Sequence, residues 1–176
     1  MDRYILKWEI GGVVFVFLLG ALLHFLFEWT GEAPPVGAIA SVNESVWEHF
    51  KQGFWPMCLY AAIEYRFLSG RSNNFLVAKA AAVYLMPVFT GLAFYAYTAV
   101  TGEHFLIVDI LLFLAAIILG QFVSYRILTM KKLPRYLSGI AIAAIITLAV
   151  ILVLFTYTPP QMPIFLDETG FYGLPR

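Results

Sequence analysis

The 176-residue sequence has a single cysteine and few charged residues. One thiol cannot form a disulfide within the chain, and Cys58 lies in an apolar stretch, so we expect it to pack as a small hydrophobic residue. Charged residues make up 12% of the chain, their formal sum is zero, and no basic run exceeds Lys131-Lys132. This balance argues against nucleic-acid binding and against a polybasic lipid-binding patch.

Sequence motifs of the familiar enzymes are also missing. The chain has no HExxH, no Gly-x-Ser-x-Gly, no phosphate-binding glycine loop and no CxxC. Ser45 lies four residues before His49, but a serine at a helix start is usually a cap, and a catalytic dyad needs a third group to orient it. The motifs therefore indicate no reaction.

Apolar residues dominate what is present. They make up 61% of the chain, and the mean hydropathy is +0.83. A soluble domain this small must show a polar surface to water, so we expect a multi-pass protein of the cell membrane, with the lipid bilayer as its surroundings. A helix crosses the hydrocarbon layer with about 20 mostly apolar residues. We predict an all-α integral membrane bundle of five transmembrane helices, at Ile5–Trp29, Asn43–Leu68, Phe75–Val100, His104–Leu128 and Pro134–Thr156.

The orientation of the bundle follows from its basic residues. Lysine and arginine collect in cytoplasmic connections. Here they flank the first span and the second and fourth connections, whereas most acidic residues fall at the opposite end. The N-terminus is therefore predicted to be cytoplasmic. The Ser-x-x-Glu pattern that begins at Ser41 is typical of a capping box and predicts that the second helix starts near Val42.

Ionisable residues are concentrated in the outward half of the predicted bundle. At a rise of about 1.5 Å per residue, His24, His49 and Asp109 all lie roughly 8–9 Å inside the ends of their spans. His104 lies at the same outer interface, and Glu28 is one helical turn from His24. Because ionisable groups are costly in a membrane, we expect them to face an interior site.

Imidazole and carboxylate groups are a common ligand set for zinc and other divalent ions, and an open coordination position polarises a water molecule. We therefore predict an outward-facing site for zinc or another divalent metal. Its predicted ligands are His24, Glu44, His49, His104 and Asp109. Glu28 and Glu48 are the candidate catalytic bases.

Other interpretations fit the same residues. Glu44, Glu48 and Lys51 share one face of the predicted second helix, so an intrahelical ion pair explains them without a ligand. A hydrogen-bonded polar cluster without metal, or a proton pathway, also explains ionisable groups at this depth.

Three functions follow as alternatives. The first is a membrane metalloprotein, with a hydrolase-like or sensor role toward a small-molecule or lipid ligand at the outer face. The second is a small-solute or proton-coupled transporter, with a polar path from the level of His24 to Glu64 and Gln121; Glu64 itself is expected to meet Arg66 or interfacial water. The third is a structural or assembly subunit without catalysis, in which the polar cluster holds the helices in register.

The last residues form a segment of a different kind. Residues 158–176 are too rich in proline for a sixth span and too apolar for an ordinary disordered terminus. We predict a transmembrane domain at 1–157 and an extracytoplasmic tail at 158–176. The tail is expected to pack on the outer face of the bundle, where it either roofs the polar cluster or only covers helix ends.

Three stretches of the chain resemble a known family. They are HFLFEW at 24–29, VNESVWEH at 42–49 and, in the tail, PPQMPIFLD followed by YGLP. They are similar to a family of small prokaryotic integral membrane proteins defined as a domain of unknown function. The resemblance covers almost the whole chain and implies a compact multi-span membrane fold from bacteria or archaea. It implies no activity.

Overall fold

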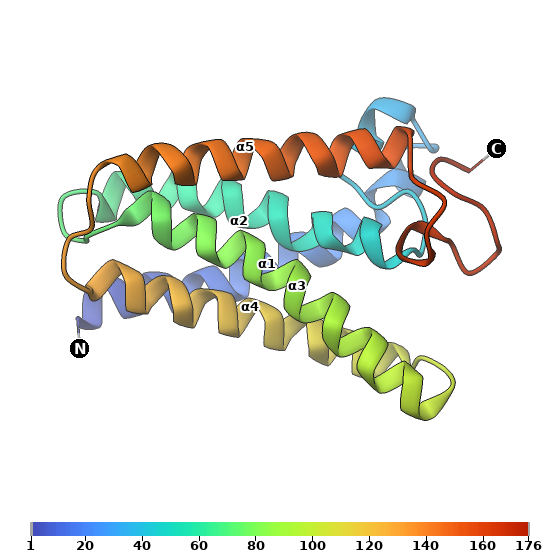
Figure 1. Ribbon diagram of the computed structural model, residues 1–176, viewed down its shortest axis with the longest axis horizontal. Helices are drawn as coiled ribbons and strands as arrows, with labels where there is room; N and C mark the ends of the chain where they lie inside the picture. Colours follow the sequence, from blue (N-terminus) through green and yellow to red (C-terminus); the bar gives the residue numbers. More distant parts are fainter. Residues whose placement is uncertain (1, 176) are drawn as a thin grey trace.

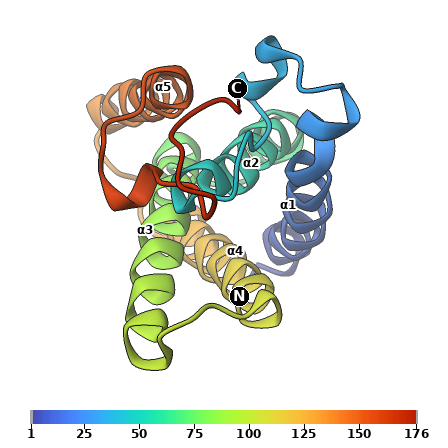
Figure 2. The same ribbon diagram turned by 90° about the vertical axis from the view of Figure 1, so that its right-hand side faces the viewer.

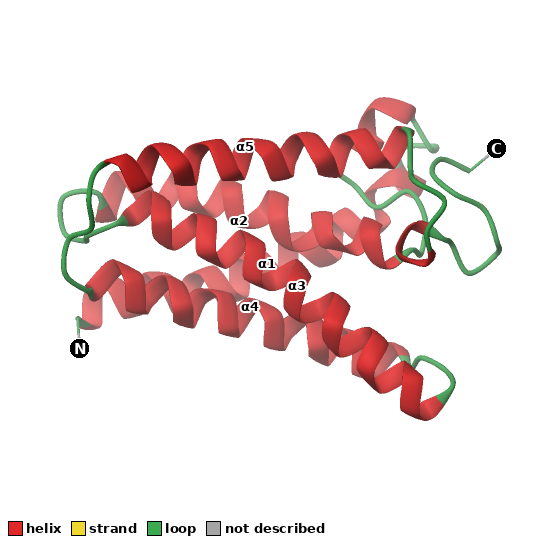
Figure 3. Ribbon diagram, viewed as in Figure 1, coloured by secondary structure: helices red, strands yellow, loops and turns green. Residues whose placement is uncertain are grey.

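The computed structural model describes residues 2–175, which form a bundle of five long helices with two short 3-10 helices in the connections (Figures 1 and 3). The helices are α1 (Arg3–Trp29), η1 (Pro34–Ala38), α2 (Val46–Leu68), α3 (Phe75–Thr101), α4 (Leu106–Thr129), α5 (Tyr136–Tyr157) and η2 (Pro163–Phe165). Within the described residues no strand forms, and Leu166 and Tyr172 make an isolated bridge. The predicted all-α fold is confirmed.

Four of the helices, α1, α3, α4 and α5, are long and apolar enough to cross a membrane. Such lengths and compositions are those of a membrane protein. The remaining long helix, α2, carries buried polar and charged side chains, which make it less hydrophobic. It lies in the middle of the bundle, in contact with α1, α3 and α5 (Figure 2), so its polar groups meet other helices and not lipid.

The connections fall at two ends of the bundle. The N-terminus, the α2–α3 connection and the α4–α5 connection lie together at what we call the N-terminal end (Figure 1). The α1–α2 connection, the α3–α4 connection and the C-terminal tail lie at the opposite end, the tail end. This arrangement matches the alternation expected of five successive spans.

The start of α2 differs from the prediction. The helix begins at Val46, and its cap is Ser45, whose Oγ accepts a hydrogen bond from a backbone N–H one turn into the helix. The capping box predicted at Ser41 is therefore wrong. The tail holds this part of the chain outside the helix, because the backbone N–H of Glu44 donates to Asp167 (2.8 Å). The fourth and fifth helices also begin two residues later than predicted.

The tail packs on the tail end of the bundle. The ring of Phe165 contacts Trp47 at the start of α2 and Phe155 at the end of α5, with centroid distances of 4.7 and 5.5 Å. Asn43 Nδ2 donates to the carbonyl oxygen of Gly173 (2.8 Å). These contacts hold the α1–α2 connection, α2 and α5 together around the residues of the candidate site.

Candidate metal site

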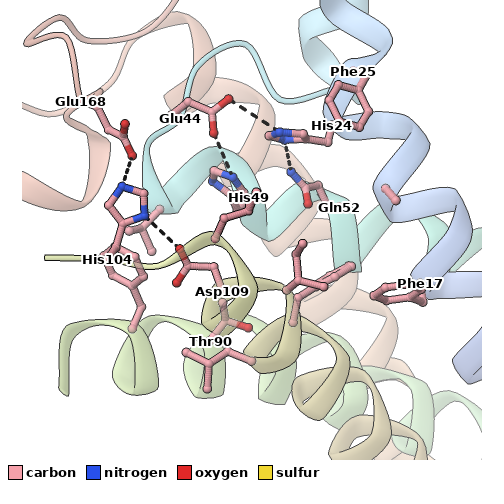
Figure 4. Close-up of a pocket in the computed structure, with 17 residues that line it drawn as sticks. Phe17, His24, Phe25, Glu44, His49, Gln52, Thr90, His104, Asp109 and Glu168 are labelled. Atoms are coloured by element: carbon pink, nitrogen blue, oxygen red, sulfur yellow. Dashed lines mark hydrogen bonds and ion pairs between the residues drawn. The ribbon is translucent and has the colours of Figure 1, made fainter. Parts of the chain in front are cut away.

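A cavity of about 330 Å³ lies toward the tail end, between α1, α2, α3 and α4 (Figure 4). All three histidines of the chain line it. Most of its remaining lining is an apolar wall, which consists of Phe17, Phe25, Phe94, Leu106, Ile110 and Phe113. The cavity therefore combines a hydrophobic surface with a small number of ionisable groups, as ligand sites usually do.

Three of the predicted ligands converge on one side of this cavity. His24 comes from α1, Glu44 from the connection before α2, and His49 from the first turn of α2. The Nε2 atom of His24 is 3.7 Å from Glu44 Oε1, and that of His49 is 3.4 Å from Glu44 Oε2 (Figure 4). One donor atom from each residue lies within 4.8 Å of the others. We call these residues the His24–Glu44–His49 cluster.

Those spacings are close to the separation of ligands around a small tetrahedral ion. Zinc binds nitrogen and oxygen at about 2.0–2.2 Å, which places neighbouring ligands of a tetrahedron about 3.3–3.6 Å apart. The His49–Glu44 distance of 3.4 Å has that value, and the His24–Glu44 distance of 3.7 Å is slightly longer. The donor atoms of the two imidazoles lie within 4.8 Å of each other.

Hydrogen bonds fix the ring of His49. Its Nδ1 lies 2.8 Å from the carbonyl oxygen of Ser45, and because a carbonyl only accepts, Nδ1 must carry the proton. The Nε2 atom then has two options. It is protonated and pairs with Glu44 as an imidazolium, or it keeps its lone pair and binds a cation together with Glu44.

The ring of His24 is held by a side-chain amide. Gln52 Nε2 lies 2.9 Å from His24 Nδ1 and also donates to Ser41 Oγ, whose hydroxyl donates to the Glu48 carbonyl. In this pattern His24 Nδ1 accepts, so a neutral ring carries its proton on Nε2. If the amide turns over, its oxygen accepts from Nδ1–H, which leaves His24 Nε2 free to bind a metal. Ser41 can then donate to this oxygen only by giving up its hydrogen bond to the Glu48 carbonyl.

Electrostatics keep the carboxylate of the cluster ionised. The hydrogen bond from His49 holds the pKa of the Glu44 carboxyl below its usual range, against the opposing effect of partial burial. Burial alone would raise the pKa of Asp167, but hydrogen bonds from Thr169 and from the Glu44 backbone outweigh it, so this pKa is also lowered. The charged Asp167 accepts the Glu44 N–H and so positions the residue whose carboxylate belongs to the cluster.

His104 and Asp109, the other two predicted ligands, line the same cavity but belong to a second cluster. His104 Nδ1 is 3.0 Å from Asp109 Oδ2, and its Nε2 is 2.9 Å from Glu168 Oε1 in the tail. The hydrogen bond with Asp109 raises the pKa of His104. Tyr97 donates to the other oxygen of Asp109 (2.5 Å). Both ring nitrogens of His104 thus face carboxylates, and Figure 4 shows this cluster beside the first.

The two predicted bases lie elsewhere. Glu28 is exposed near the end of α1 and does not line the cavity. Glu48 is buried, contacts Lys51 Nζ at 2.5 Å and accepts from Thr156 Oγ1 at 2.8 Å. The intrahelical ion pair between Glu48 and Lys51 is therefore present, but Glu44, outside the helix, takes no part in it. The carboxylate of Glu48 holds α2 to α5.

Two lining residues were missed by the sequence reasoning. Gln52 follows His49 by one turn, so helical spacing alone could have placed it on the same face. Glu168 carries no such signal, because its position depends on how the tail folds back.

The expected contacts of the inward polar residues need correction. Glu64 does not meet Arg66: it lies 2.5 Å from Lys79 of α3. Between this level and the histidines, the bundle interior is occupied by apolar side chains, which include Val16, Phe54, Met57 and Ile117. This layer argues against a continuous polar path through the bundle.

Comparison with known families finds one match. The model of the family described as "Family of unknown function (DUF6512)" matches residues 2–174. The match covers nearly the whole chain, in agreement with the family resemblance of the three stretches. No curated protein and no solved structure matches the chain.

Proposed function

Because the chain belongs to the family of unknown function DUF6512, which assigns it no activity, we propose a function from its own residues: it is a protein of the cell membrane that binds a divalent metal ion of the zinc type at His24, Glu44 and His49. The observation that supports this is the convergence of three ligand side chains, from three separate segments, at spacings near those of a tetrahedral site. A fourth position is then left for water or a ligand from the cavity.

Charge balance supports the same ion. Two neutral imidazoles and one carboxylate give a divalent ion a net charge of +1, and a bound hydroxide brings the total to zero. A neutral centre suits the apolar wall, where an uncompensated charge would be costly. Zinc with three protein ligands commonly lowers the pKa of its bound water to about 7.

A hydrolase-like role is the chemistry that such a centre would perform. The ligand would be an amphiphile such as a lipid, with its apolar part on the wall of phenylalanines and its polar group at the metal. His104 lies on the same cavity and is held between Asp109 and Glu168, so it is the group that would donate or accept a proton there. In this proposal Glu48 is an anchor for the helices, and Glu28 does not contact the ligand.

We infer that this site faces the outside of the cell. Lysine and arginine residues occur at the N-terminal end, where Arg3, Arg71 and Lys131 are found near the chain start and in the two connections. By the preference of cytoplasmic connections for these residues, the N-terminal end is cytoplasmic. The cavity then opens toward the outer leaflet.

Metal analysis of the purified protein tests the proposal. We expect about one zinc per chain after loading and removal of free metal, and loss of that zinc in the His24→Ala and His49→Ala variants. Glu28→Gln is the matched control and should retain the metal, because Glu28 is exposed and lies off the cavity. Wild-type protein without zinc, or His49→Ala protein with the same zinc content, would refute the proposal. In a purely structural cluster, these histidine variants would only lower the melting temperature.

The amide beside His24 gives a finer test. Gln52→Glu replaces an amide that donates to Nδ1 by a carboxylate that accepts from it, so Nε2 becomes the better ligand. Mutation of the hydrogen-bond partner of a metal-binding histidine changes metal affinity by roughly 10- to 100-fold. Competition with a chelator should therefore show tighter zinc binding in Gln52→Glu and weaker binding in Gln52→Leu. The opposite order would contradict the geometry proposed for His24.

A further inference from the structure

A second group of buried ionisable residues lies toward the N-terminal end of the bundle. Glu9 of α1, Glu64 of α2 and Lys79 of α3 are 2%, 0% and 2% exposed. Lys79 Nζ is 2.8 Å from Glu9 Oε1 and 2.5 Å from Glu64 Oε2. From α4, Ser124 Oγ donates to Glu9 Oε1 (3.1 Å). We call the three ionisable residues the Glu9–Lys79–Glu64 cluster, and four helices meet at it.

The charges of this cluster do not balance. Two carboxylates and one ammonium sum to −1, and among residues 2–175 no other cation pairs with them. The neighbouring polar groups are neutral: Tyr60 of α2, whose hydroxyl donates to the Trp8 carbonyl, and Ser124 of α4. An isolated charge buried at this depth is costly, and proteins usually remove it by taking up a proton or a counter-ion. The cluster therefore requires one more positive charge.

Unpaired polar atoms show where such a charge would be held. Within the described residues, Glu9 Oε2 and Glu64 Oε1 have no hydrogen-bond partner. Gln121 is 2% exposed, and neither its amide nitrogen nor its amide oxygen has a partner. The Gln121 amide packs against Gly12, one turn beyond Glu9 on α1. Buried groups without partners are rare in native proteins and point to a missing ligand or proton.

The cluster also has a route by which a proton can exchange. Lys79 lines a second cavity, of about 280 Å³, between α2, α3 and α5. Tyr65 lies on the wall of the same cavity and is exposed near the end of α2. The cavity thus lies beside Lys79 and extends toward the N-terminal end of the bundle, the side from which we propose that the proton exchanges.

We propose that the Glu9–Lys79–Glu64 cluster is a binding site for one exchangeable proton. The proton forms an O–H bond with one carboxylate of the pair, and the charge of the cluster changes from −1 to zero. A sodium ion would also supply the charge, but it would lie against the Lys79 ammonium and be repelled by it. This proton site is separate from the His24–Glu44–His49 cluster and does not depend on it, because Val16, Phe54 and other apolar residues lie between the two.

Infrared spectroscopy of the full-length protein in lipid nanodiscs tests this proposal. At neutral pH, the wild type should show the C=O stretching band of one protonated carboxyl group, and the band should shift in D₂O. Glu9→Gln and Glu64→Gln each leave one carboxylate for one ammonium, so both variants should lose the band. Glu28→Gln is the matched control and should keep it, since Glu28 is exposed.

Stability measurements keep the test decisive if a variant folds poorly. Because a glutamine amide replaces the protonated carboxyl by a neutral group of similar shape, each glutamine variant should be at least as stable as the wild type, whereas Lys79→Met should be much less stable. A wild-type spectrum without the protonated band would overturn the proposal, and so would a band that persists in both glutamine variants. Stabilisation by sodium without any protonated carboxyl would overturn it in favour of a metal cation.

Discussion

Replacing Lys51 by methionine should strongly destabilise the fold. Lys51 Nζ is fully buried and contacts three oxygens: Glu48 Oε2 at 2.5 Å, the Gly37 carbonyl at 2.6 Å and Thr156 Oγ1 at 2.9 Å. Methionine fills a similar volume, but it leaves the Glu48 carboxylate buried without a counter-charge. Removal of one partner from a buried ion pair costs about 3–5 kcal/mol, and we expect a loss of that size.

A second variant separates the ion pair from the packing. In the double variant Glu48→Gln/Lys51→Met no charge is left buried. Val42 N–H and the Thr156 hydroxyl bind separate oxygens of Glu48, so the new amide oxygen can still accept from Val42 N–H while the amide NH₂ donates to Thr156 Oγ1. The double variant should therefore recover about 1–3 kcal/mol relative to Lys51→Met alone. Lys132→Met is the control, because Lys132 is exposed, and it should change stability by less than about 0.5 kcal/mol.

Reversible unfolding of the full-length protein in mixed micelles, followed by tryptophan fluorescence, measures these differences. Two results would refute the reasoning. One is a loss of less than about 1 kcal/mol in the free energy of unfolding of Lys51→Met, because a buried carboxylate without its counter-charge destabilises the fold by more than that. The other is a double variant no more stable than Lys51→Met, because the cost would then come from the shape of the side chain and not from its charge.

Two further predictions concern packing and pH. Gly12→Ala should lower the free energy of unfolding by about 1–3 kcal/mol, because its Cβ would lie 1.8 Å from Gln121 Nε2 and 2.7 Å from the Tyr60 ring. Gly139→Ala is the control: its Cβ would meet no neighbouring group within 4 Å, so it should be neutral or stabilising in the same assay. Equal effects of the two substitutions would contradict this prediction. The hydrogen bond with Asp109 raises the pKa of His104 above its ordinary value of 6.5, so its stabilisation is complete below that pH and is lost as the pH rises through the raised value. The melting temperature should then fall with rising pH in the wild type but not in His104→Gln, and parallel curves would disprove the assignment.

The sequence was sufficient to predict the five long helices. Four of them are long and apolar enough to cross a membrane, and such runs have few alternatives to a helix there. The depth of His24 and His49 followed from the fixed rise of a helix, which placed both imidazoles at one level without any knowledge of packing. Both imidazoles were expected to meet Glu44 because ionisable groups are costly in a membrane and gather at an interior site. Whether they meet is decided by helix rotation, which the spacing along the chain does not contain.

Other features depended on contacts between distant parts of the chain. The pattern Ser-x-x-Glu occurs twice in succession, at Ser41 and at Ser45, and only the hydrogen bond from Glu44 to Asp167 decides which serine caps α2. Glu48 looked equivalent to Glu44 in sequence, but it enters the helix and pairs with Lys51. Local propensity cannot decide which serine is the cap, because Asp167, the partner of Glu44, lies more than a hundred residues away.

The folded-back tail has a consequence for biogenesis. His24 and Glu44 are translated well before Asp167 and Glu168. A nascent chain can insert its first helices one after another, yet the loop that carries Glu44 and the imidazole of His104 gain these partners only once the tail has been made. The tail end of the cavity is therefore completed after the helices that form its walls.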